Sequence, residues 1–187
     1  MMRWDELESA CASCCRCKLC EQRKNVVLGT GNQNADIMLI GEGPGEQEDL
    51  QGIPFVGAAG KLLDAMLSII DLDRTNCYIA NVVKCRPPFN RDPSDEEQAA
   101  CVPYLAQQIA LVKPKIIICL GRIAAKKIIS TDFRITRQHG TWTEHNGIHI
   151  TAMYHPSALL RDAAKRPETF MDLMAIRDKV QQLHIQL

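Results

Sequence analysis

The stretch GEGPGEQEDLQGIPFVGAAG, residues 41–60, directly follows the apolar run IMLI at 37–40. Glycines after a buried strand let the backbone approach a ligand closely. The stretch contains neither GxGxxG nor GxxxxGK[ST], so the motifs of dinucleotide-binding and P-loop proteins are absent. A plain strand-to-helix turn does not explain why Phe55 stands between Pro54 and Val56 in a glycine-rich loop. The stretch therefore predicts a ligand-binding loop at the end of a buried strand.

Short apolar segments alternate with amphipathic segments along the rest of the chain. Buried strands are predicted at 35–41, 77–83 and 115–120, and helices at 57–70, 94–112, 122–129 and 167–183. Ser94 and Glu97 form a capping box at the start of one helix, and Asn146-Gly147 marks a hairpin turn. This alternation indicates an α/β fold, a mostly parallel sheet covered by helices on both faces.

Ligands of such folds bind beyond the carboxyl ends of the strands. Three loops leave those ends here, after Ile40, Val83 and Met153, and we expect the chemistry among them. The second loop, KCRPPFNRDP at 84–93, is rich in proline, which argues against regular structure within it.

Length and composition limit the classes of function. We expect the 187 residues to form one domain, 1–187, with a Cys-rich lead-in at 1–25, and to act as a monomer. Lys+Arg and Asp+Glu both number 22, so nucleic-acid binding would need local basic clusters. No apolar run approaches ~20 residues and the first ten lack a signal-peptide core, so we expect a cytoplasmic protein without a membrane span.

Nine cysteines without a secretion signal indicate metal or cluster chemistry rather than disulfides. Cys77 and Cys119 lie in apolar strands and are expected to be core residues. A Cys-x2-Cys pair near the start and two later cysteines can hold an iron–sulfur cluster or, as the alternative, zinc. These four are Cys14, Cys17, Cys85 and Cys101, although the overlapping pair Cys17-x2-Cys20 leaves the first choice open.

Three motifs resemble a known family. GEGPGEQEDLQGIPFVGAAGKLLD, YIANVVKCRPPFNRDP and MYHPSALLR, in this order, are similar to the motifs of family 4 uracil-DNA glycosylases, the iron–sulfur type. The resemblance implies a three-layer α/β/α sandwich, a [4Fe–4S] cluster and removal of uracil from DNA to leave an abasic site. It also selects Cys14 and Cys17 as the first pair of cluster ligands, and makes Cys20 a neighbour that is not a ligand.

Removing uracil requires that the base be flipped from the stack and then recognised. The resemblance makes Phe55 the stacking platform and Asn81 the residue that reads the uracil edge. A side-chain amide offers one donor and one acceptor, which fits uracil and misfits cytosine. We expect His155 to donate a hydrogen bond to O2 of the departing base. The expected uracil contacts are Gly41, Glu42, Gly43, Phe55, Asn81 and His155.

Cleavage gives the sugar oxocarbenium character, which a carboxylate can stabilise. Family 1 enzymes use an Asp at the position that is Gly43 here, so the acidic role must pass to another residue. We expect Glu48 to activate water and Glu42 mainly to shape the pocket. The loop around residues 45–48 is expected to form the wall that rejects thymine.

The resemblance also implies a DNA-binding surface. Leu159 is expected to wedge into the gap that the flipped base leaves, with Ser157 and Arg161 on phosphates. Lys84 and Arg86, beside the cluster loop, are expected to bind phosphates as well. Uracil-containing DNA, single- or double-stranded, is thus the expected partner.

Three other functions compete with this one, and the sequence argues against the first. A relative that traps uracil covalently would need a histidine in the segment 84–97, which has none. A zinc-stabilised nucleotide-binding protein would use the same cysteines. A non-enzymatic iron–sulfur DNA-binding or polymerase-associated module would not need Phe55, Asn81 and His155 together.

Overall fold

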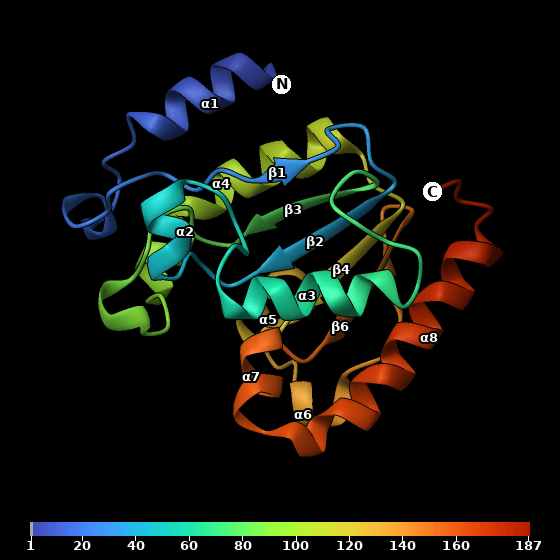
Figure 1. Ribbon diagram of the computed structural model, residues 1–187. Coiled ribbons are helices and arrows are strands. Elements are labelled where there is room, and N and C mark those ends of the chain that lie inside the picture. Colours follow the sequence, from blue (N-terminus) through green and yellow to red (C-terminus); the bar gives the residue numbers. More distant parts are fainter. Residues whose placement is uncertain (1) are drawn as a thin grey trace.

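The computed structural model describes residues 2–187 and has a six-stranded sheet at its centre (Figure 1). The strand order is β1-β3-β2-β4-β6-β5. The four inner strands β3, β2, β4 and β6 run parallel, and β1 and β5 pair antiparallel at the two edges. The strands are β1 Thr30–Gly31, β2 Ile37–Gly41, β3 Cys77–Asn81, β4 Ile116–Leu120, β5 Thr143–His145 and β6 Ile148–Met153.

Helices cover both faces of the sheet, which confirms the expected α/β/α layers. Residues of α4 and α5 pack with Met38 and Ile40 on one face, and residues of α3, α7 and α8 pack with Ile37 and Leu39 on the other. The helices are α1 Trp4–Ala12, α2 Glu46–Gln51, α3 Ala58–Ser68, α4 Asp95–Val112, α5 Arg122–Ile128, α6 Ile135–Gln138, α7 Pro156–Arg161 and α8 Arg166–Gln182. Three short 3-10 helices span Lys18–Glu21, Pro88–Asn90 and Ala163–Lys165.

Alternation of side chains along the inner strands produces these two cores. Successive residues of a strand point to opposite faces, and all four apolar residues of β2 are fully buried. Burying one such side chain contributes about 1.5–3 kcal/mol, so a run without polar residues is stable only inside a covered sheet. The apolar run at 37–40 therefore forms the centre of the molecule.

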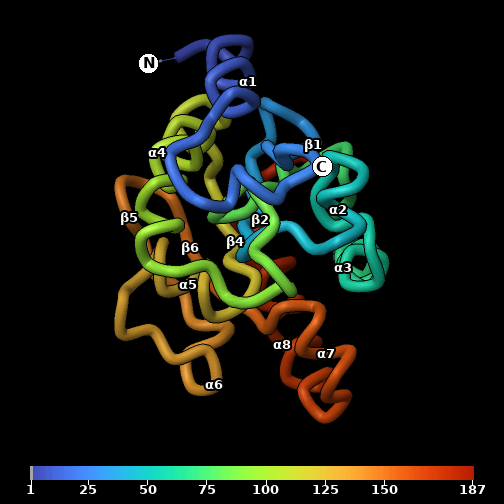
Figure 2. Tube along the Cα trace, turned by 90° about the vertical axis from the view of Figure 1, so that its left-hand side faces the viewer, coloured from blue at the N-terminus to red at the C-terminus, as the bar shows by residue number. Residues whose placement is uncertain are grey.

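The N-terminal segment packs on the α4 side of the sheet. Helix α1 lies beside α4 (Figures 1 and 2), and the Trp4 ring stands 5.4 Å from the ring of Tyr78 in β3. Leu7 and Cys11 of α1 are buried in the same core. A long loop then leads from α1 back to β1.

Two local predictions have different outcomes. The capping box at α4 is confirmed, because the Glu97 N–H donates to Ser94 Oγ at 3.2 Å and the Ser94 N–H donates to Glu97 Oε2 at 2.8 Å. The loop at 84–93 contains one tight turn at Pro88–Asn90, in which Phe89 and Asn90 have left-handed rather than helical backbone angles. Within residues 2–187, no helix combines the length and the apolar character that crossing a membrane requires.

Candidate active site

A cavity of about 580 Å³ opens at the carboxyl ends of the parallel strands. Its walls include residues that follow β2, β3 and β6, the three places that the sequence indicates. A fourth wall was missed: Gly121 and Arg122, directly after β4, also line the cavity. The glycine after the apolar run 116–120 was the available signal.

Asn81 ends β3 directly beside Gly41, its partner residue in β2. Only 2% of Asn81 is exposed, and its Oδ1 atom has no hydrogen-bond partner. Among the described residues it is the one buried side-chain nitrogen or oxygen in this condition. A Cβ atom on Gly41 would stand 2.4 Å from this oxygen, so only glycine leaves the amide in place. An unpaired buried acceptor is costly, which indicates that a ligand donates to it.

Phe55 lines the cavity in a left-handed backbone conformation, with φ of 55°. The Glu48 carboxylate stabilises this conformation from one side, because its Oε1 accepts the N–H groups of Val56 and Gly57, both at 2.8 Å. Glu48 itself is 9% exposed. The sequence did not predict this anchoring, which occupies one oxygen of the residue expected to activate water.

Arg74 holds the same loop from the other side. Its guanidinium donates to the carbonyl oxygens of Pro54, at 3.0 Å, and of Phe55, and its Nε is 2.9 Å from Asp64 Oδ1. A Cβ atom on Gly60 would collide with the Phe55 carbonyl at 1.8 Å. The Phe55 ring is therefore fixed by contacts that hold the backbone before and after it.

His155 faces Phe55 with 5.6 Å between ring centroids. Its Nδ1 accepts the Ser157 N–H at 3.2 Å and lies 2.6 Å from Ser157 Oγ, so the side chain caps α7. Burial, with a smaller effect of Arg161, lowers the pKa of His155 to about 4. The imidazole is therefore neutral, and because Nδ1 accepts, the proton belongs on Nε2. Gly121 permits this placement, since a Cβ there would stand 2.8 Å from the His155 Cβ.

Glu42 is the acidic residue directly after β2 and lines the cavity. Burial, and then the neighbouring Asp92 carboxylate, raise the pKa of Glu42 to about 7. Arg122 and Arg161 act in the opposite direction but more weakly. A carboxyl group with this pKa can exchange a proton near neutral pH. Asp92 and Arg122, paired at 2.5 Å, were not predicted from the sequence.

Three of the five residues expected to bind DNA lie in the cavity wall or next to it. Ser157 and Arg161 line the cavity. Arg86 lies next to the cavity, because its Nε donates at 2.8 Å to Oδ1 of Asn90, which lines it, and 25% of the Arg86 side chain is exposed. The remaining two residues lie elsewhere.

Lys84 and Leu159 are corrections. Lys84 is 1% exposed and donates from Nζ to the carbonyl oxygen of Asn81 at 2.7 Å and to Gln108 Oε1 at 2.5 Å, so it cannot reach a phosphate. Leu159 is 2% exposed and packs in the core, whereas its neighbour Leu160 is 48% exposed. The exposed apolar side chain of α7 is thus one residue later than expected.

The four predicted cysteine ligands gather around one small cavity on the α4 side. Cys14 and Cys17 come from the loop after α1, Cys85 from the loop after β3, and Cys101 from α4. Cys11, which sequence reasoning did not single out, and Cys20 line it as well. The thiol of Cys15 is the main cause that raises the pKa of Cys20, so Cys20 interacts with an exposed neighbour.

The surroundings of these thiols suit a thiolate-bound group. Arg23 donates from Nη1 to Cys85 Sγ at 3.2 Å and to the carbonyl oxygen of Cys14 at 2.7 Å. The N–H of Lys84 donates to Cys101 Sγ, also at 3.2 Å. Hydrogen-bond donors and cations near sulfur are what negatively charged cluster ligands require.

Comparison with known proteins agrees with this geometry. The model of the uracil DNA glycosylase superfamily matches residues 28–176. The type-4 uracil-DNA glycosylase of Archaeoglobus fulgidus is 43% identical over 180 residues, which cover 92% of this chain and 90% of that protein. The type-4 enzymes of Sulfurisphaera tokodaii and Pyrobaculum aerophilum are 44% and 42% identical, over 93% and 92% of this chain and 83% and 92% of their own. The chain belongs to the uracil-DNA glycosylase superfamily and, within it, to the type-4 uracil-DNA glycosylases.

Proposed function

We propose that this protein flips uracil out of DNA and hydrolyses its N-glycosidic bond, leaving an abasic site. The observation that carries the proposal is the buried Asn81 Oδ1 atom without a donor, in a cavity that Phe55 and His155 also line. The relatives named above are uracil-DNA glycosylases, which supports the same reaction here.

Recognition of uracil follows from the chemistry of an amide. Asn81 Oδ1 would accept the N3–H of uracil, and its Nδ2 would donate to O4. Cytosine presents an acceptor at N3 and an amino group at position 4, so both contacts would be lost and a buried acceptor left unpaired. Phe55 would stack on the flipped base, a contact worth about 1–3 kcal/mol in other nucleic-acid complexes.

Departure of the base would be assisted from its O2 side. When the C1′–N1 bond breaks, its electron pair stays with uracil, and negative charge develops on O2. The neutral His155 would donate from Nε2 to that oxygen, because its Nδ1 is occupied by Ser157.

Glu42 would act on the deoxyribose. As the bond breaks, C1′ becomes positively charged, and an ionised Glu42 would stabilise it and orient the attacking water. The water oxygen then bonds to C1′, and the proton passes to the carboxylate, whose raised pKa suits this transfer. Glu48 would act by holding the Phe55 loop, since its Oε1 accepts two backbone N–H groups.

We propose that Cys14, Cys17, Cys85 and Cys101 hold a [4Fe–4S] cluster. The proposal is supported by the gathering of these thiols around one small cavity, where Arg23 donates to Cys85 Sγ and the Lys84 N–H donates to Cys101 Sγ. When bound, the cluster would supply iron–thiolate bonds that join the N-terminal segment to the loop after Asn81 and to α4. The hydrolysis itself is redox-neutral and needs no electron from it.

The direct test uses an end-labelled oligonucleotide with one uracil, treated with brown, iron-loaded protein and then with alkali. We expect a cut at uracil and none in matched strands with thymine or cytosine. Asn81→Ala should reduce the rate by at least 100-fold, because the unpaired edge of the base loses its only amide partner. Absence of cutting by iron-loaded protein would refute the enzymatic function and support a DNA-binding module instead.

A further inference from the structure

Phe89 lies in the loop that joins β3 to α4, and it is 98% exposed. It is the most exposed large apolar side chain among residues 2–187. Its backbone is also in the left-handed region, with φ of 55° and ψ of 22°, and Asn90 follows at φ of 55°. This conformation is energetically unfavourable for a residue other than glycine, and Phe89 gains no compensating stabilisation from burial inside the protein.

The surrounding loop is braced in a way that fixes this conformation. Before Phe89, the prolines at 87 and 88 restrict the backbone, and the Asn90 N–H donates to the Pro87 carbonyl at 3.0 Å. After it, Arg91 forms a two-pronged ion pair with Glu97 of α4, at 2.7 and 2.8 Å. The strained residue is therefore presented on a rigid loop.

The loop stands at the entrance of the proposed uracil pocket. Pro87, Asn90 and Arg91, which flank Phe89 on both sides, line the same cavity as Asn81. Arg161 of α7 lines the same cavity. A DNA strand that delivers uracil to Asn81 must cross this entrance, so the bases beside the uracil pass next to Phe89.

We propose that Phe89 is a base-stacking contact for an unpaired base adjacent to the flipped uracil. The inference rests on the proposed function. An aromatic ring held rigidly beside cationic groups is the usual means of binding unpaired bases, because every base has a face for stacking. Within a duplex the neighbouring bases remain paired and stacked, so the contact favours uracil in single-stranded or unpaired DNA.

The test measures the Kd for a single strand that contains 2′-fluoro-2′-deoxyuridine, whose glycosidic bond resists cleavage, with fluorescent 2-aminopurine next to it. Phe89→Ala should weaken binding roughly tenfold and abolish the quenching of 2-aminopurine, whereas Phe89→Trp should retain both. On the fully paired duplex, Phe89→Ala should change the Kd by less than about threefold. Equal losses on both substrates, or no loss on the single strand, would overturn the inference.

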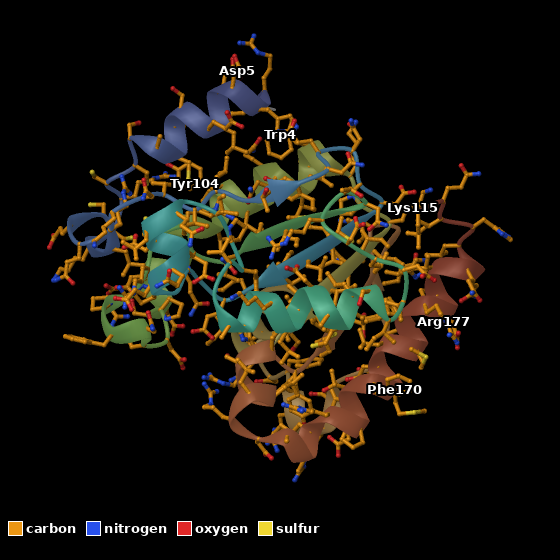
Figure 3. The ribbon with its side chains drawn as sticks, in the orientation of Figure 1. Trp4, Asp5, Tyr104, Lys115, Phe170 and Arg177 are labelled. Atoms are coloured by element: carbon orange, nitrogen blue, oxygen red, sulfur yellow. The ribbon has the colours of Figure 1, made fainter. Side chains whose placement is uncertain are left out.

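Phe170 supplies a matched control, because it is 46% exposed on α8. Figure 3 shows it on the right of the molecule, whereas the light-green loop at 84–93 lies on the left in Figure 1. Phe170→Ala should bind DNA as the wild type does.

Phe89→Gly should not lower the melting temperature of the protein, since the change removes backbone strain and no packing contact. A drop of several degrees would show that Phe89 stabilises the fold and would contradict the stacking role. If the wild type fails to excise uracil, the proposed function fails, and the Kd and quenching data still decide on stacking.

Discussion

Glu42, directly after β2, and Glu48, in helix α2, belong to one acidic segment, and their surroundings separate their roles. Glu42 borders the cavity, where burial and Asp92 raise its pKa to about 7. Glu48 instead accepts hydrogen bonds from the N–H groups of Val56 and Gly57 with one of its carboxylate oxygens. The first environment suits proton exchange, and the second suits fixing a loop.

Replacing each carboxylate by an amide should distinguish these roles. Glu48→Gln keeps an oxygen that can accept both N–H groups, so kcat should fall less than about tenfold. Glu42→Gln removes the charge beside C1′ and should lower kcat by roughly 100-fold or more. Single-turnover excision rates measure both, and the reverse order would assign water activation to Glu48.

The raised pKa of Glu42 also predicts a pH dependence. Because the proposed mechanism requires ionised Glu42, kcat should rise with pH up to about 7 and then level off. His155, with its pKa near 4, stays neutral over this range and adds no second limb. Stability should change in the opposite sense: the folded pKa exceeds the unfolded value, so Glu42 destabilises the fold increasingly from pH 4.5 through 7.

Unfolding in urea at pH 4 and pH 8 tests that sign. Glu42→Gln should be more stable than the wild type at pH 8 and not at pH 4. The same variant should also lose the rising limb of the kcat profile. A wild-type kcat that is flat between pH 5 and pH 9 would exclude Glu42 as the titrating group.

At the scale of elements, the Phe55 loop depends on contacts from distant parts of the chain. Arg74, which precedes β3, donates to the Pro54 and Phe55 carbonyls, while Asp64 of α3 orients the guanidinium. These contacts hold the ring against the cavity before any base arrives. Such preorganisation lowers the cost of binding the flipped base.

Arg74→Met should therefore impair catalysis although Arg74 does not contact the base. We expect kcat/KM for uracil excision to fall roughly tenfold, and inhibition by free uracil to weaken similarly, since stacking on Phe55 is lost. Asp64→Asn is the control, because it leaves the two carbonyl contacts in place and should fall less than threefold. If Arg74→Met lowers thermal stability without changing uracil inhibition, Arg74 is only structural.

The sequence predicted those parts of the site that local patterns specify. The apolar runs at 35–41 and 77–83 placed Gly41 and Asn81 in buried strands, although the second strand ends at Asn81 rather than at Val83, and the capping box located α4. It did not predict the burial of Lys84, because the partner Gln108 lies 24 residues away on α4. Leu159 was misplaced since a six-residue helix has too few turns for a pattern to define its buried face. Local patterns thus could not predict the contacts between residues that lie far apart in the sequence.

At the scale of the whole molecule, the cysteine cavity joins the N-terminal segment, the loop after β3 and helix α4. Arg23 bridges the loop after α1 to Cys85, and Cys85 stands four residues after Asn81. A cluster at this place would fix the loop that follows Asn81 at the end of β3. Its contribution to folding would equal its free energy of binding.

Cysteine variants test which thiols hold the cluster. Cys85→Ser and Cys101→Ser should lose iron, lose the absorption bands of charge transfer from thiolate to iron, and unfold at a lower temperature than the wild type. Cys15→Ser is the exposed control and should keep full iron, as should Cys20→Ser. Iron and sulfide analysis on each purified variant gives the answer. Loss of iron from Cys20→Ser but not from Cys14→Ser would require a different ligand set.

The central claim is hydrolysis of the bond between uracil and deoxyribose. The most direct measurement is the mass of a uracil-containing oligonucleotide after a single turnover, before any alkali is added. We expect that the strand loses one uracil, gains one water and remains unbroken, and that free uracil appears in equal amount. A strand of unchanged mass, a strand already cut, or a covalent adduct with the protein would contradict it.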